Sequence, residues 1–224
     1  MRHIFFTLLL LGASAVSPAM AQEEFKPSPY LELGVGLNMV PTVSTQTYTL
    51  TSGPNTATGR IDLDYDTGFA AGAELGYAGL GIPELRAGVG YDYLEGTFSN
   101  GKVVGSVNGT AGSFPFTRAD ITALGASLDN DIHLVSGNLY YSLPMVGPVR
   151  PYVGGGAGVA FISQADAQFA LSATAGLRMA LSEHGYLGLR YRFYRMEGPV
   201  DSLGIQYEPV MAHSVMVMLG GYFD

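Results

Sequence analysis

Seven charged residues share one face of segments in which apolar and non-apolar residues alternate. Side chains at alternate positions of a β-strand point to opposite faces, so these charges point away from the apolar side. Their carboxylates and guanidinium groups can neutralise one another if the fold encloses them. The sequence therefore predicts a network of charges on one enclosed face. Its members are Glu32, Glu74, Arg86, Asp92, Arg178, Arg190 and Arg192.

Glu74 and Arg86 are the two residues of this set that we expect to pair directly. They lie on consecutive alternating segments, at similar distances from the short turn that joins them. Antiparallel neighbours bring such positions together. The sequence therefore predicts an ion pair between them.

Histidines offer a second possible chemistry, because acid–base or nucleophilic catalysis pairs a histidine with a serine or a carboxylate. His213 and Ser214 are adjacent, so in a strand they point to opposite faces. His133 shares a face with Asp131, and we interpret it as a solvated histidine at a loop end. His184 falls in a predicted turn. We predict no catalytic, cofactor-binding or metal-binding residue, and a lipid-modifying enzyme ranks third among the possible functions.

The composition excludes other classes of protein. The chain has 224 residues, with 11 Lys and Arg, 19 Asp and Glu, a formal net charge of −8 and no cysteine. Nucleic-acid binding needs a basic surface, and thiolate chemistry needs cysteine, so we expect neither. Asp62, Asp64 and Asp66 share one face outside the predicted membrane span. A solvated edge is their expected role, and binding of divalent cations by the carboxylates is the alternative.

The first 21 residues have the three parts of a secretory signal peptide. Arg2 is positive, Ile4 to Leu11 are apolar, and Ala19-Met20-Ala21 is a small-residue cleavage site. We expect residues 1–21 to be cleaved and residues 22–28 to form a short periplasmic segment. The remaining residues, 29–224, are expected to form one β-barrel domain.

Strands are the elements that position these side chains. Residues 61–77 keep one alternating phase for longer than the roughly 9 to 11 residues of a strand that crosses a bilayer, so their early part is expected to project beyond the membrane. After the signal peptide there is no apolar run long enough for a transmembrane helix. The predicted strands lie near 29–40, 60–78, 85–98, 131–144, 150–162, 167–182, 186–196 and 212–223.

The connections between these strands fall into two groups, short turns and long loops, and most connections alternate between the two along the chain. Short turns on one rim and long loops on the other are typical of a transmembrane β-barrel, with turns in the periplasm and loops outside the cell. The short connections are 79–84, 145–149, 164–166 and 182–185, and the long ones are about 40–60, 99–130 and 197–211. We predict an all-β, eight-stranded antiparallel transmembrane barrel.

The seven charges also indicate which face meets lipid. A soluble barrel of the lipocalin type would need the Leu, Tyr and Phe residues inside, and eight strands leave too little room for them. If the face with charges and glycines is inside instead, small residues make space for the ionic groups. The apolar face then meets lipid, and the lumen is closed by the charges.

The chain resembles the small bacterial outer-membrane β-barrel proteins of the OmpA-like and opacity-protein type. The segment Arg150 to Phe161, RPYVGGGAGVAF, and the last strand, His213 to Asp224, carry the resemblance. It implies a bacterial outer-membrane location and contact with lipid and lipopolysaccharide. It also implies an assembly signal for the barrel-assembly machinery at Gly220, Tyr222 and Phe223.

We expect a structural or surface-interaction protein, whose extracellular loops carry any specificity for a ligand. A narrow porin-like diffusion channel for small solutes or ions is the first alternative. An eight-stranded lumen is roughly filled by its own side chains, which favours the closed barrel.

Overall fold

The computed structural model describes residues 27–163, 165–200 and 204–223. The predicted signal peptide and most of the predicted segment 22–28 lie outside these residues. Within the described part of the chain, no helix combines the length and apolar character needed to cross a bilayer.

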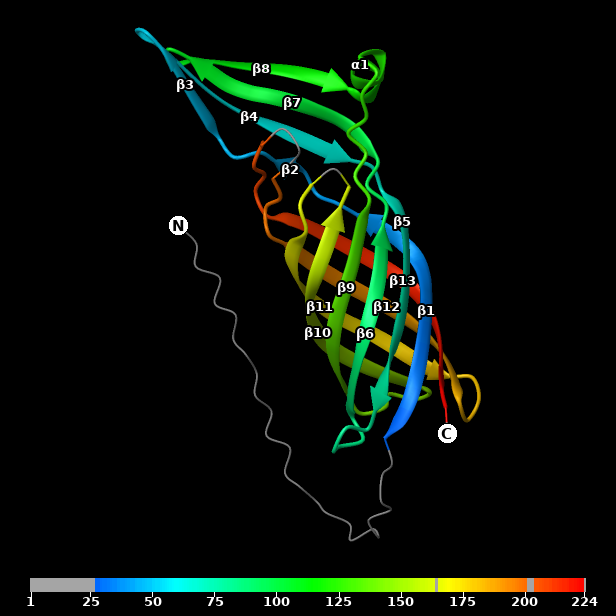
Figure 1. Cartoon of the computed structure of the whole chain (residues 1–224). Coiled ribbons are helices and arrows are strands. Elements are labelled where there is room, and N and C mark those ends of the chain that lie inside the picture. Colours follow the sequence, from blue (N-terminus) through cyan, green and yellow to red (C-terminus); the bar gives the residue numbers. More distant parts are fainter. Residues whose placement is uncertain (1–26, 164, 201–203, 224) are drawn as a thin grey trace.

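Eight antiparallel strands close into a barrel in the order β1-β13-β12-β11-β10-β9-β6-β5, which confirms the predicted fold (Figure 1). The first and last strands pair, with Leu33 opposite Leu219. Three of the predicted short turns join strands at the end of the barrel where the C-terminus lies. The barrel strands are β1 (Ser28–Met39), β5 (Gly68–Ala78), β6 (Leu85–Leu94), β9 (Ile132–Ser142), β10 (Val149–Ile162), β11 (Gln168–Ala180), β12 (Gly185–Met196) and β13 (Val210–Tyr222).

The apolar face of each barrel strand points outward. On β1, Leu33, Val35 and Leu37 are exposed, whereas Glu32 and Asn38 are buried in the lumen. The same alternation recurs on the other barrel strands. An exposed belt of Leu, Val, Phe and Tyr suits lipid rather than water as the surrounding solvent.

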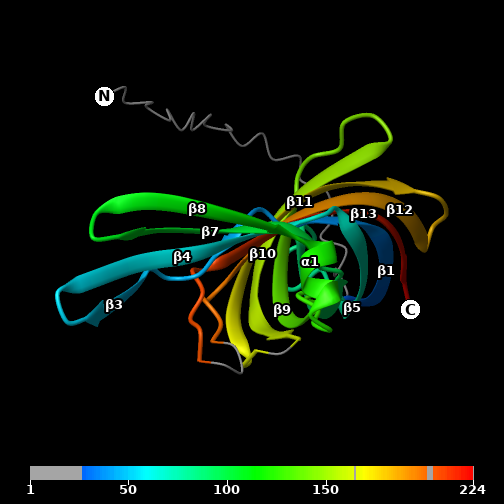
Figure 2. The same cartoon turned by 90° about the horizontal axis from the view of Figure 1, so that it is seen from above.

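A second sheet extends from the barrel end opposite the short turns. It has the order β2-β4-β7-β8, with β3 paired to β4. Figures 1 and 2 show that it rises above this end and reaches out to one side of the barrel. Its elements are β2 (Val43–Ser44), β3 (Tyr48–Ser52), β4 (Asn55–Tyr65), β7 (Phe98–Val107) and β8 (Thr110–Thr117), followed by helix α1 (Arg118–Ala123).

The predicted strand 60–78 is wrong as a single element, because the chain leaves the barrel wall at Asp66 and Thr67. The Asp66 N–H donates to the Thr97 carbonyl at this break. Below it, β5 pairs with β6, and beyond it β4 pairs with β7. The expected projection of the first residues of this segment beyond the barrel is confirmed, because they belong to β4. The predicted strand 85–98 is also too long, since β6 ends at Leu94.

The predicted long connections at 40–60 and 99–130 are confirmed, and they contain most of this second sheet, which the sequence analysis did not predict. A signal for the β7–β8 hairpin was present at Asn108-Gly109, the pair that favours a tight turn with positive φ at both positions. The structure gives φ values of 51° for Asn108 and 83° for Gly109. Recognition of this turn would have predicted the hairpin.

Candidate functional site

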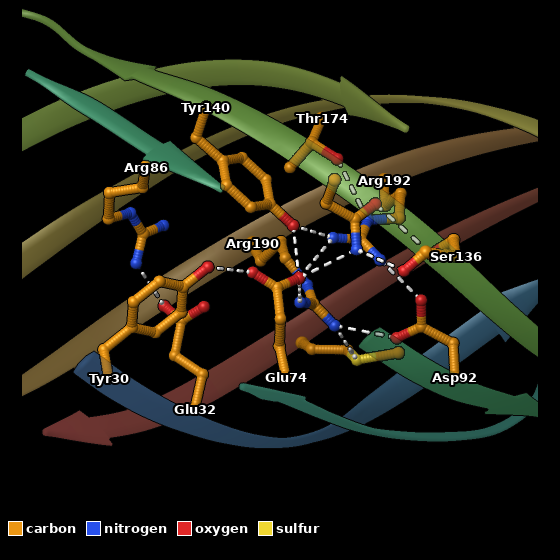
Figure 3. A network of polar contacts seen from close by, with 12 residues as sticks. Tyr30, Glu32, Glu74, Arg86, Asp92, Ser136, Tyr140, Thr174, Arg190 and Arg192 are labelled. Atoms are coloured by element: carbon orange, nitrogen blue, oxygen red, sulfur yellow. Dashed lines mark hydrogen bonds and ion pairs between the residues drawn. The ribbon is translucent and has the colours of Figure 1, made fainter. Parts of the chain in front are cut away.

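All seven predicted charges lie in the lumen and are buried, with Arg178 the most exposed at 7%. They come from five strands, β1, β5, β6, β11 and β12. Figure 3 shows six of them converging from opposite walls of the barrel. Buried charges are stable only when they are paired and hydrogen-bonded, so their partners determine what the lumen can do.

Asp92 is the centre of one cluster. Its Oδ1 lies 2.9 Å from Nη2 of Arg190, and its Oδ2 lies 2.5 Å from Nη1 of Arg192 (Figure 3). The Arg192 Nη2 also lies 3.4 Å from Oε2 of Glu74, and its Nε donates to the Thr174 hydroxyl at 2.9 Å. This cluster contains two carboxylates and two guanidinium groups, so its formal charges balance.

Glu74 receives hydrogen bonds that the sequence analysis did not predict. The hydroxyls of Tyr30 and Tyr140 each donate to it at 2.5 Å, and Asn138 Nδ2 donates at 3.0 Å. Tyr30, Asn138 and Tyr140 occupy the same alternating phase as the charges, and this phase was the signal that could have identified them. With these donors, the Glu74 carboxylate is satisfied without water.

Glu32 forms a second cluster with two arginines. Its Oε1 lies 3.6 Å from Nη1 of Arg86 and 3.5 Å from Nε of Arg178. The Arg86 guanidinium lies 4.6 Å from the Tyr30 ring centroid, and that of Arg178 lies 4.4 Å from the Tyr152 ring centroid. Two arginines share the one carboxylate of Glu32, so one positive charge is left over, and the aromatic rings stabilise it.

The predicted direct pair between Glu74 and Arg86 is wrong. In the β5–β6 ladder, Glu74 lies opposite Gly90, whereas Arg86 lies opposite Ala78, four residues nearer the turn. Each residue therefore pairs with a charge on another strand. Glu74 lies five residues before the turn 79–84 and Arg86 only two residues after it, so the two residues are not level in the hairpin.

An apolar layer fills the lumen between the charges and the extracellular rim. Leu94, Leu134 and Met196 are almost completely buried there. Together, the charge network and this layer fill the lumen with side chains over most of its height. The layer consists of Val40, Ala70, Leu94, Ile132, Leu134, Ala160, Ile162, Ala170, Tyr194, Met196, Val210 and Ala212. Met216 and Met218 belong to the same apolar cluster but lie lower on β13, where Met216 is opposite Arg190.

The three histidines of the described residues, His133, His184 and His213, have side chains that do not point into the lumen. His133 lies at the loop end of β9, as its second residue, and is half-buried, with its Nδ1 2.7 Å from the hydroxyl of Tyr91. His213 makes the same contact with Tyr191, at 2.8 Å. Ser214 points into the lumen beside Tyr194, away from His213. No His–Ser pair for nucleophilic catalysis forms at these positions.

Asp62 is not part of a solvated edge, and that expectation is wrong. It is buried, with Arg60 Nε 3.0 Å from Oδ1 and Lys102 Nζ 3.7 Å from Oδ2. The Ser44 hydroxyl donates to it at 2.7 Å. Asp64 accepts from the Thr42 hydroxyl at 2.6 Å, so these two aspartates stabilise the second sheet.

The three residues of the expected assembly signal point in different directions. Tyr222 faces the lumen, where its hydroxyl accepts from Arg178 Nη1 at 3.2 Å and its ring packs against Tyr186. A side chain at Gly220 would meet the Tyr186 ring. Phe223 is the exposed aromatic residue of the three.

Comparisons with known proteins agree with this architecture. Residues 6–223 match the family model described as "Outer membrane protein beta-barrel domain". The crystal structure of Neisserial surface protein A (NspA) is similar over 89% of this chain and 100% of that one, with a TM-score of 0.56 and 14% identity. This likeness concerns the fold.

OprG from Pseudomonas aeruginosa covers 88% of this chain and 96% of its own, with 16% identity and a TM-score of 0.42. The structure of AlkL in lipid bilayers matches 95% of this chain and 97% of the AlkL chain, with 14% identity and a TM-score of 0.44. No curated protein sequence matches the chain. The chain is a bacterial outer-membrane β-barrel and belongs to the family of the outer membrane protein beta-barrel domain.

Proposed function

We propose that this chain is a closed barrel with a surface-interaction role, which holds its second sheet at the cell surface and conducts no ions. The observation that carries this proposal is the contact between Asp92 and Arg192, which spans the lumen between opposite strands. An ion that passes this point would have to separate a buried, hydrogen-bonded pair. The proposal ranks a narrow diffusion channel second and an enzyme third.

The apolar layer supports the same proposal independently of the charges. Leu94, Leu134 and Met196 lie above the network and present no polar side chain to a permeating ion. A hydrated ion would lose its water there without gaining another ligand. Two barriers of different chemistry therefore oppose conduction.

The second sheet supports the surface role. Leu50, Val107 and Phe114 lie on one of its faces and are exposed by 73%, 58% and 74%. Exposed apolar patches of this kind mark interaction surfaces. In this proposal, an extracellular ligand contacts the sheet, lipid and lipopolysaccharide surround the barrel, and the barrel-assembly machinery inserts it.

Planar-bilayer recording with the purified, refolded chain tests the proposal. We expect no sustained ohmic current, because both barriers remain in place at moderate voltages. A heat-modifiable gel shift of the recorded sample serves as the control for folding. Sustained currents that scale with salt concentration would overturn the closed-lumen proposal and favour the diffusion channel.

A further inference from the structure

A cavity of about 140 Å³ lies at the extracellular mouth of the barrel, above the apolar layer. Every extracellular connection of the barrel contributes at least one residue to its wall. The lining residues are Val40, Val43 and Tyr65 before β5, Gly96, Ser127, Leu128, Asn130 and Ile132 near β9, Ile162, Ser163 and Ala165 after β10, and Pro199, Tyr207 and Val210 near β13.

The lining of this mouth cavity is apolar with few polar groups. None of its residues is Asp, Glu, Lys, Arg or His. A charged ligand would lose its hydration there without a charged partner, so the lining selects neutral molecules. Val40, Ile132 and Ile162 are buried parts of the apolar layer and form its floor.

Tyr65 and Asn130 form a hydrogen-bonded pair among the polar residues of the lining, which also include Ser127, Ser163 and Tyr207. Asn130 Nδ2 donates to the Tyr65 hydroxyl at 3.1 Å. Burial raises the pKa of Tyr65, so its hydroxyl keeps its proton at neutral pH and can donate in turn. A ligand that carries one hydroxyl or carbonyl group would find a hydrogen-bonding partner at this side of the cavity.

The volume limits the size of the ligand. Cavities of about 150 Å³ with apolar walls bind a single benzene ring. The floor closes the route downward, because Leu94 and Leu134 lie between the cavity and the charge network. A molecule that enters must leave by the same route.

We propose that the mouth cavity is a binding site for one neutral, ring-sized apolar molecule with a single polar group, such as a simple phenol. The proposal deepens the surface-interaction role and rests on the closed lumen of the proposed function. It gives that role a ligand of defined chemistry, which is bound at the mouth and not passed through the barrel.

Fluorine NMR with 4-fluorophenol as the probe tests this site, with the full chain in lipid nanodiscs. Nanodiscs without protein give the signal from partition into lipid, which is subtracted. We expect saturable binding to the wild-type chain at one site. No saturable binding beyond that of empty nanodiscs would overturn the proposal.

Matched substitutions on β13 locate the bound probe. Val210 lines the cavity, whereas Val215 points outward to lipid on the same strand. Val210→Phe fills the cavity and should weaken binding at least tenfold, whereas Val215→Phe should leave it unchanged. Equal affinity in the two variants would place the probe elsewhere and overturn the site. Val43→Phe is a second filling variant at a half-buried position, should Val210→Phe fail to fold.

An enlarged cavity provides a positive test. Ile162→Ala removes part of the wall and should allow saturable binding of 2-naphthol, which the wild-type cavity is too small to hold. Tight 2-naphthol binding to the wild-type chain would contradict the size limit. If the chain carries no current and binds no probe, the ligand site is disproved and the closed lumen stands. If the chain carries current and binds the probe, the closed lumen is disproved and the ligand site stands.

Discussion

Asp92 on β6 and Arg192 on β12 meet across the full width of the barrel, with 2.5 Å between Oδ2 and Nη1. In the closed strand order, the two strands are four positions apart in both directions, so they are diametrically opposite. The pair therefore ties together two walls that share no backbone hydrogen bonds. Its loss should affect the whole barrel.

Asp92→Asn should lower the free energy of unfolding by about 3 to 5 kcal/mol, because Arg190 and Arg192 then share only the Glu74 carboxylate. Urea unfolding in lipid vesicles, followed by heat-modifiable gel mobility, measures this change. Asp129→Asn is the control, since its pair with Arg118 is exposed on both sides. That substitution should cost no more than about 1 kcal/mol, and an equal loss in both variants would contradict the prediction.

Double-mutant cycles should separate true partners from false ones. Asp92→Asn with Arg192→Gln should show a coupling energy of about 0.5 to 3 kcal/mol, as contacting groups do. Glu74→Gln with Arg86→Gln should couple more weakly, because each residue pairs with another charge. The reverse order of the two coupling energies would disprove these pairings.

Gly156→Ala should destabilise the barrel by about 1 to 3 kcal/mol, the cost of overpacking. A Cβ there would lie 2.8 Å from the Gly137 carbonyl and would collide with the Asn138 side chain. Gly137→Ala on the neighbouring strand is the matched control, because its Cβ would meet nothing within 4 Å. Similar urea midpoints for the two variants would show that Gly156 is not there to make space.

The cap of α1 should weaken in acid. Hydrogen bonds from the Thr117 backbone N–H and hydroxyl lower the pKa of Asp120 below its ordinary 3.8. A lowered pKa in the folded state means that the stabilisation is complete above pH 3.8 and is lost as the pH falls through the lowered value. NMR titration of the Thr117 amide should follow this loss, and Asp120→Asn should abolish the pH dependence.

Phe223→Ala should reduce the amount of folded barrel in the outer membrane, because Phe223 follows β13 directly and is the exposed aromatic residue of the proposed assembly signal. Tyr222→Phe should leave assembly largely intact, since its ring faces the lumen. Heat-modifiable gel mobility of membrane fractions measures both. A stronger defect in Tyr222→Phe than in Phe223→Ala would contradict the assignment of the signal to Phe223.

The direction of each side chain could be predicted from sequence, and its partner could not. Alternation alone determines the face, so Glu32 and Arg190 were placed on the enclosed side. Partners depend on the register and stagger of strands that are distant in sequence. The Glu74–Arg86 pair failed for a simpler reason, because these residues lie five and two residues from the turn of one hairpin and are therefore four residues out of register.

The tyrosines illustrate a second limit. Tyr30 and Tyr140 share the alternating phase of the charges, but tyrosine is also enriched in the interfacial belts of membrane proteins. Only the three-dimensional position of Glu74 gives their hydroxyls a role. Apart from residues 60–65 of β4, the second sheet was missed for a different reason, since its other strands alternate weakly and its hairpin turn at Asn108-Gly109 was not used.

The distances along the chain between the lumen partners also constrain the order of folding. Arg192 lies 100 residues from Asp92 and 118 from Glu74, so each contact joins an early strand to a late one. Such long-range contacts form late, after the loops between them have closed. Until β12 and β13 are inserted, Glu74 and Asp92 face an unfinished lumen without their arginines. The nascent barrel must therefore keep these acids in contact with water, and the lumen dries only when the last strand seals the wall.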